Sequence, residues 1–241
     1  MMSFILIFIV LSVKSKSLQD YVDASENQKK EVLDKLELLT SEIRKSPDCE
    51  NTLWNVDRDR NSVQVYFDDS GQKQEWFKVG EEHLTKEGER CVSHFARKWL
   101  STIYLDPVRS KIAQLIVEGH TDSQRIMKSE CQDSNGKDVM NFLCNLDLSQ
   151  KRSFNTVKIM FEQVNRQDFQ ATSLAEDWDH FSSWRKRRLT ATGRSFADPI
   201  LIQVGEGSNQ KVEDRERSRR VEFRFSMHGV LDRKPTSDDE F

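Results

Sequence analysis

The sequence predicts an α+β fold: a two-layer sandwich with helices packed on one face of a mixed sheet, in the order β-α-β-α-β-β. Residues 63–67 and 221–226 alternate apolar and polar side chains, which is typical of strands with one buried face. Residues 85–104 carry an apolar stripe at helical spacing. Residues 115–118 form a short apolar run, which favours a buried strand. Together these patterns predict alternating strands and helices.

The first helix is expected in the highly charged segment of residues 17–46. Its apolar positions follow steps of four, three and four residues, the narrow seam typical of a coiled coil: Val32, Leu36, Leu39 and Ile43. This seam predicts self-association into a dimer. Pro47 follows the segment and is expected to end the helix.

A later helix is expected to begin at Asp147 or Ser149, as its cap, and to end near residue 164. One face carries Asn145, Ser149, Arg152 and Thr156. The opposite face carries Phe154, Val157, Phe161 and Val164. We therefore expect a helix that buries its apolar face and presents a polar face for recognition.

Two insertions interrupt the predicted order, at residues 123–142 and 168–187. The second contains Trp178 and Trp184, which could stack on sugar rings or pack the insertion onto the domain. Residues 189–193 follow and read as a strand and a turn.

Composition excludes several functions. The 241-residue chain carries a net charge of −3, and its basic run at residues 185–188 lacks the interleaved aromatic residues of a nucleic-acid surface. Nucleophile–base motifs, phosphate loops and metal-binding histidine spacings are missing from the sequence. We therefore expect no enzymatic activity, no cofactor, no metal and no nucleic-acid partner.

Four cysteines are present, and none has the CxxC spacing of a zinc site. An even number permits two disulfides in an oxidising compartment, although free thiols fit the sequence equally. Cys131 and Cys144 bracket a polar loop and are the better candidate pair.

The chain begins with an almost wholly apolar segment, residues 1–13, followed by Lys14. A spanning helix needs about 20 apolar residues, and a signal peptide needs a basic start. The segment is therefore the distal part of a longer span, a signal-like segment, or a buried or disordered end. We divide the chain into an apolar segment (1–16), a charged helical linker (17–60), a folded domain (61–230) and an acidic flexible tail (231–241).

Two charged residues stand out at the end of the strand and on the helix that follows. Asp122 follows the apolar strand directly, and Arg152 lies on the polar helix face. A carboxylate and a guanidinium can clamp a small zwitterion by pairing both of its charges. The alternative is a structural ion pair that ties strand to helix.

Residues 63–227 resemble the OmpA C-terminal-like peptidoglycan-binding domain, which is shared with MotB-type stator subunits. The resemblance rests on motifs in the family's order: Gly119-His120-Thr121-Asp122, Asn145 to Ser153, Gly193, and Arg219-Arg220-Val221-Glu222. Residues 123–144 separate the first two motifs, a longer stretch than the family usually has, and could lid the pocket or block it.

The resemblance implies noncovalent binding of peptidoglycan, centred on the diaminopimelate of the stem peptide. Asp122 would pair with the ligand's ammonium group and Arg152 with its carboxylate. The rest of the pocket would be formed by Thr121, Asn145, Leu148, Arg219 and Arg220.

Residues 1–13 are similar to the distal half of the membrane helix of MotB-like subunits. The whole arrangement also resembles the B subunit of Zorya anti-phage systems. These resemblances imply a single-pass inner-membrane homodimer with its folded domain in the periplasm. With a MotA-like partner, it would anchor an ion-driven, stator-like complex to the cell wall. The alternatives are an interaction module of the same fold that has lost peptidoglycan binding, or a plain cell-envelope anchor.

Overall fold

The computed structural model describes residues 2–49, 52–59, 62–67, 76–78, 80–105, 109–110, 112–124, 126, 131, 138–169, 176–204 and 210–227. The acidic tail expected at residues 231–241 lies outside the described residues, as does most of the 123–142 insertion. The elements are α1 (Met2–Ile43), β1 (Thr52–Asp57), β2 (Ser62–Phe67), α2 (Lys86–Leu105), β3 (Ile112–Gly119), α3 (Asp138–Gln163), η3 (Arg166–Phe169), α4 (Trp178–Arg188), β4 (Leu189–Gly193), β5 (Leu201–Gln203), β6 (Lys211–Glu213), α5 (Arg215–Ser218) and β7 (Val221–Met227).

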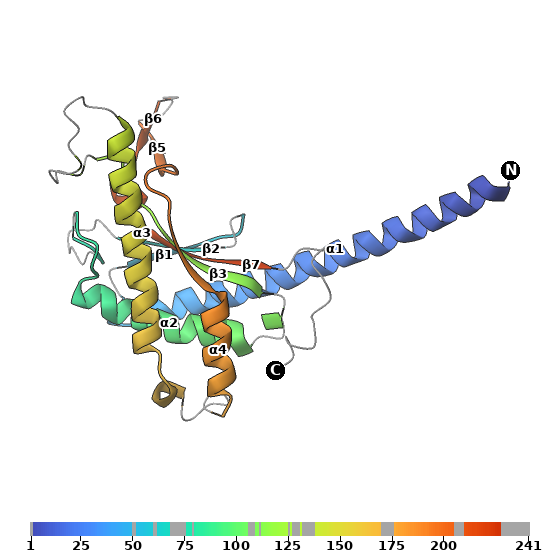
Figure 1. Ribbon diagram of the computed structural model, residues 1–241, viewed down its shortest axis with the longest axis horizontal. Helices are drawn as coiled ribbons and strands as arrows, with labels where there is room; N and C mark the ends of the chain where they lie inside the picture. Colours follow the sequence, from blue (N-terminus) through green and yellow to red (C-terminus); the bar gives the residue numbers. More distant parts are fainter. Residues whose placement is uncertain are drawn as a thin grey trace.

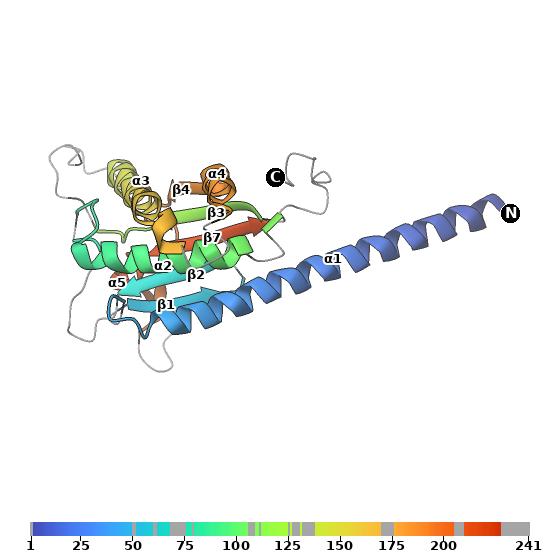
Figure 2. The ribbon, with the colours of Figure 1, turned by 90° about the horizontal axis from the view of Figure 1, so that it is seen from below.

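The described part of the chain forms a five-stranded sheet with the order β1-β2-β7-β3-β4, and a separate β5–β6 hairpin. Strands β3 and β4 run parallel, whereas the other neighbouring strands run antiparallel. Helices α2 and α3 pack on the same side of the sheet (Figures 1 and 2). The prediction of an α+β fold with helices on one face of a mixed sheet is confirmed.

The core is formed by this face of the sheet with side chains of α1, α2, α3 and α4, and its aromatic centre lies against α2. Strand β7 turns Val221, Phe223 and Phe225 toward the helices, as its alternating pattern predicts. The ring of Phe223 lies 4.4 Å from that of Phe95 in α2, measured between centroids. Trp54 of β1 joins this aromatic cluster, 4.8 Å from Phe95. Buried aromatic pairs of this kind contribute through both area and geometry.

Helix α1 does not use its apolar seam for a coiled coil in this structure. Val32, Leu36, Leu39 and Ile43 are buried in the core of the domain itself. An apolar stripe covered by its own chain avoids the entropy cost of association, so the seam no longer supports dimerisation. Strand β1 also lies in the region predicted as a linker and pairs with β2. The folded unit therefore begins within α1, before the predicted boundary at residue 61.

Three further contacts fasten the end of α1 to the domain. The guanidinium of Arg58 lies 2.6 Å from an Asp34 oxygen and 2.8 Å from a Glu37 oxygen. A disulfide joins Cys49, just after α1, to Cys91 in α2, with a Cα–Cα distance of 5.1 Å. The N-terminal part of α1 extends away from the domain (Figures 1 and 2). Among the described residues, we find no helix with both the length and the apolarity that crossing a membrane requires.

Helix α3 begins at Asp138, nine residues before the predicted cap at Asp147. The face expected to be exposed is instead buried: Ser149 and Thr156 are inaccessible, as is the neighbouring Ser153. On the opposite face Phe154 is 59% exposed, whereas Val164 is fully buried. Small side chains on α3 face Gly119 and Gly193 of the sheet, which allows the helix to approach closely. Each buried hydroxyl donates to a carbonyl one turn earlier in the helix. The prediction that the polar face is exposed was therefore wrong, whereas the predicted burial of the apolar face holds for Val164 and in part for Val157.

The insertion at residues 168–187 packs against the domain through aromatic side chains. The ring of Trp184 is buried and lies 5.3 Å from that of Tyr104 in α2. Arg185 is also buried and donates to the backbone carbonyl of Val164, beyond the end of α3. For Trp184 the packing interpretation therefore holds, and part of the basic run is structural.

Candidate ligand-binding site

The strand-end segment with Thr121 and Asp122 is held from both sides. The backbone N–H of His120 donates to the carbonyl of Arg220 at 2.9 Å. The backbone N–H of Thr121 donates to the carbonyl of Ser195 at 3.0 Å. Asp122 therefore follows β3 in a fixed position although it lies beyond the strand itself.

The carboxylate of Asp122 is engaged at both oxygens. Arg219 donates through Nη1 to Oδ2 at 2.8 Å, and the backbone N–H of Gln124 donates to Oδ1 at 3.1 Å. The Asp122 side chain is only 7% exposed, whereas that of Arg219 is 22% exposed. A guanidinium and a carboxylate therefore form a mostly buried pair, with the guanidinium at the more exposed end.

Arg152 lies on α3 as predicted, and its described hydrogen bonds go to backbone carbonyls. Its Nε donates to the carbonyl of Glu81 at 2.9 Å and its Nη2 to that of Lys78 at 3.2 Å. The guanidinium also lies over the ring of Phe77, 5.0 Å from the centroid. Arg152 thus fastens the loop before α2 to α3. Its predicted role as the ligand's carboxylate partner stays a prediction.

Asn145 links α3 to the segment after Asp122. Its Nδ2 donates to the carbonyl of Gln124 at 3.1 Å, and its side chain is buried. One turn further, Leu148 is also buried. The neighbouring Cys144 forms a disulfide with Cys131, so one point of the insertion is fixed beside Asn145. Half of the segment that could lid or block the pocket lies outside the described residues.

Ser195 is a residue of the site that the sequence motifs do not identify. Its φ of 55° is the one positive value among the described non-glycine residues, and its side chain is fully buried. Its N–H donates to Ser149 Oγ at 3.0 Å and its hydroxyl to the carbonyl of Phe142 at 3.1 Å. Since its own carbonyl holds Thr121, Ser195 joins α3 to the strand end. The one signal in the sequence is its place two residues after Gly193.

Arg220 is directed away from Asp122 into a second, buried cluster. Its Nε lies 2.7 Å from Glu222 Oε1, and its Nη2 lies 3.3 Å from a carboxylate oxygen of Asp198. The side chain is only 2% exposed. The structure therefore gives Arg220 a role in internal ion pairing.

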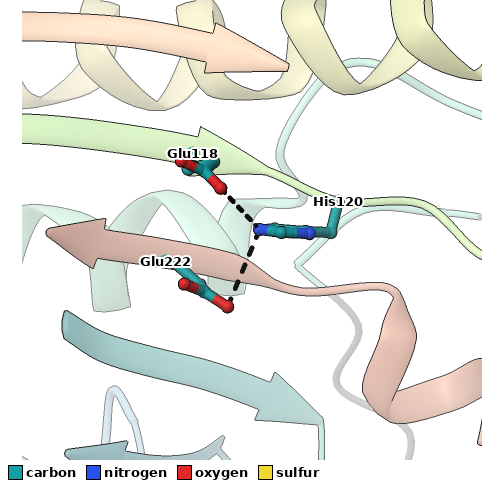
Figure 3. Close-up of side chains that lie close together, drawn as sticks. All are labelled: Glu118, His120 and Glu222. Atoms are coloured by element: carbon teal, nitrogen blue, oxygen red, sulfur yellow. Dashed lines mark ion pairs between the residues drawn. The ribbon is translucent and has the colours of Figure 1, made fainter. Parts of the chain in front are cut away.

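This second cluster also contains a histidine between two glutamates (Figure 3). His120 Nε2 lies 3.3 Å from Glu118 Oε1 and 3.7 Å from Glu222 Oε1. Glu118 and Glu222 face each other across β3 and β7. Burial lowers the pKa of His120, and the charge of Arg220 lowers it further. The imidazole is therefore neutral near pH 7.

One imidazole and two carboxylates are donors that could hold a divalent cation. However, Glu118 is already paired with Arg224 at 2.9 Å and Arg194 at 3.2 Å, and Glu222 is paired with Arg220. These guanidinium groups neutralise the carboxylates and would repel a further cation. The arrangement fits a buried ion-pair network better than a metal centre.

Comparison with known proteins gives structural likenesses at low sequence identity. No family model and no curated protein matches the chain. A MotB-like protein from Desulfovibrio vulgaris aligns with a TM-score of 0.46 and 16% identity, over 84% of this chain and 93% of that one. The periplasmic domain of Helicobacter pylori MotB aligns with a TM-score of 0.40 and 14% identity, over 75% and 84%. The OmpA-like domain of FopA1 from Francisella tularensis aligns with a TM-score of 0.33 and 15% identity, over 74% and 83%.

Proposed function

We propose that the domain binds peptidoglycan noncovalently and anchors an envelope protein to the cell wall. The observation that carries this proposal is the convergence of Thr121, Asp122, Asn145 and Arg219 at one end of the sheet. These residues belong to the motif series that resembles OmpA-like domains. The proposal rests on that convergence and not on the degree of structural similarity.

The charges at this site suit the diaminopimelate of the stem peptide. Its second amino-acid centre carries an ammonium and a carboxylate close together. Asp122 and Arg219 offer the two opposite charges within 2.8 Å of each other. Charge-assisted hydrogen bonds to both groups would give affinity and orientation.

The proposed location is the periplasm, with attachment to the inner membrane through the N-terminal segment. All four cysteines of the chain are paired in disulfides, which fits an oxidising compartment. Helix α1 leads from the apolar residues 2–13 into the domain. On the resemblance to MotB-like subunits, we propose a MotA-like membrane partner and an ion-driven, stator-like complex, with anti-phage defence as one setting.

Cosedimentation with purified sacculi tests the binding proposal. The wild-type protein is expected to cosediment, and Asp122→Asn is expected to bind at least about tenfold more weakly because it cannot pair with an ammonium. Arg187→Gln, which alters an exposed arginine on α4, is the matched control and should bind as the wild type does. Equal binding by Asp122→Asn and wild type would exclude Asp122 from the site.

A second candidate is an interaction module that has kept the fold and lost the ligand. The Cys131–Cys144 disulfide favours it, because it fixes part of the insertion beside Asn145. This candidate predicts that neither wild type nor Asp122→Asn cosediments. Sacculus binding by the wild type that depends on Asp122 would exclude it.

A further inference from the structure

We infer that the Asp122–Arg219 ion pair occupies the ligand's place in the free protein, and that a zwitterionic amino-acid centre binds by splitting this pair. The ligand's ammonium replaces Arg219 at Asp122, and its carboxylate pairs with the released guanidinium. The inference rests on the proposed function. It adds that Arg219, rather than Arg152, recognises the carboxylate.

Because the Asp122 carboxylate is buried and already paired, a ligand can bind it only by replacing Arg219. Its carboxylate is mostly buried, and its two oxygens accept hydrogen bonds from Arg219 and from the backbone N–H of Gln124. A buried carboxylate is costly without a cationic partner. The ammonium of a ligand therefore reaches Asp122 as Arg219 leaves it.

Among the three arginines predicted for the site, Arg219 is the easiest to release. Arg152 holds two backbone carbonyls of the loop before α2, and Arg220 holds Asp198 and Glu222. The guanidinium of Arg219 has one described hydrogen bond, which goes to Asp122, and it is the most exposed of the three. Arg219 also lies in the short connection between α5 and β7. Its displacement disturbs no other described hydrogen bond of its side chain.

The neighbouring Thr121 offers a further polar atom beside Asp122. Its Oγ1 is buried, and the described part of the structure provides it with no hydrogen-bond partner. Buried hydroxyls are seldom left in that state, because an unmade hydrogen bond is costly. A polar group of a ligand bound at Asp122 can supply the missing partner.

On binding, the Asp122–Arg219 ion pair is replaced by two ion pairs with the ligand. This exchange favours ligands that carry both an ammonium and a carboxylate. A ligand with an ammonium alone leaves Arg219 without a counter-charge, and a ligand with a carboxylate alone cannot displace Arg219 from Asp122. Stem peptides with meso-diaminopimelate should therefore bind more tightly than those with lysine, which keeps the side-chain ammonium and lacks the second carboxylate. Loss of a charge-assisted hydrogen bond predicts a difference of about tenfold or more.

Calorimetric titration with three disaccharide-tripeptides tests the exchange. Their third residues are meso-diaminopimelate, the same residue amidated at its side-chain carboxyl, and L-lysine. The wild type should prefer the first by about tenfold or more. In Arg219→Gln this preference should fall to near one, while Arg219→Lys retains part of it. Arg187→Gln should keep the wild-type ratio.

Two results overturn the inference, and they are distinguishable. A folded Arg219→Gln protein could still prefer the diaminopimelate ligand over the amidated and lysine ligands as strongly as the wild type does. That result would mean that Arg219 does not recognise the carboxylate. The proposed function then stands. If the wild type binds none of the three ligands, the proposed function fails and the inference fails with it. Circular dichroism melting of each variant establishes that it is folded.

Discussion

A Cβ atom at residue 119 would lie 2.3 Å from the backbone carbonyl oxygen of Ser149, so strand β3 and helix α3 meet at backbone contact distance. Gly193 in β4 meets the same turn of α3, where an added Cβ would lie 2.5 Å from the backbone nitrogen of Gln150. This close approach sets the separation between Asn145 on α3 and the segment that follows β3. The geometry of the candidate site therefore depends on two residues without side chains.

Gly119→Ala should destabilise the domain strongly, because the obstructing atom belongs to backbone and cannot rotate away. We expect a loss of about 3 kcal/mol in the free energy of unfolding, measured with urea. Gly80→Ala is the matched control. Its Cβ would meet nothing within 4 Å, so only the φ of 74° opposes it, at about 1 kcal/mol. Equal losses for the two variants would contradict the packing argument.

Removing each disulfide should destabilise the protein to a different extent. The Cys49–Cys91 bond spans 42 residues and the Cys131–Cys144 bond spans 13. Chain entropy then predicts losses of about 4 and about 3 kcal/mol for the two double-alanine variants. Urea unfolding of both variants measures these losses. A larger loss from the shorter loop would mean that contacts around residue 131 matter more than chain entropy.

Arg152→Ala should lower stability even without ligand. Two backbone carbonyls would lose a charged donor, which predicts a loss of about 3 kcal/mol in the free energy of unfolding. Arg219→Gln leaves the mostly buried Asp122 carboxylate without its cationic partner and should also lower the free energy of unfolding, by about 3 kcal/mol. Thermal melting of the two proteins compares them. A fully stable Arg152→Ala protein with weak sacculus binding would instead restore Arg152 as a ligand contact.

Stability should fall with acidification through His120. Burial holds its folded-state pKa below the ordinary value of 6.5, so the unfolded chain binds the proton more readily. The unfolding free energy therefore declines as the pH falls below about 6.5. Urea unfolding across this range, with His120→Gln as the comparison, isolates the effect. If the free energy of unfolding changed with pH in the same way in both proteins, His120 would not contribute to the pH dependence.

The strands and helices that form the sheet and its cover could be predicted because each carries its own pattern. The alternation in β7 and the stripe in α2 report their buried faces directly. The burial of the polar face of α3 could not be predicted in this way, because it depends on the close approach that Gly119 and Gly193 allow. The seam of α1 is real, but its partner is the domain core. A periodic pattern identifies a buried face and does not identify what buries it.

The residues of the candidate site could be predicted in part. The motif series identifies Asp122 and Asn145, which the structure brings to the same end of the sheet. It does not predict that Arg219, 97 residues away, holds Asp122, or that backbone carbonyls hold Arg152. Such partners depend on loop geometry, and carbonyl groups carry no signature in the sequence. Ser195 could not be predicted either, because it acts through its backbone carbonyl and its position in a loop.

Helix α1 connects the N-terminal segment to the domain without a break. The helix is unbroken from Met2 to Ile43, and the core and the Cys49–Cys91 bond grip its last turns. The 18 residue steps from Lys14 to Val32 measure roughly 27 Å along the axis at 1.5 Å per residue. The apolar residues before Lys14 are therefore held at about that distance from the part of α1 that the core covers.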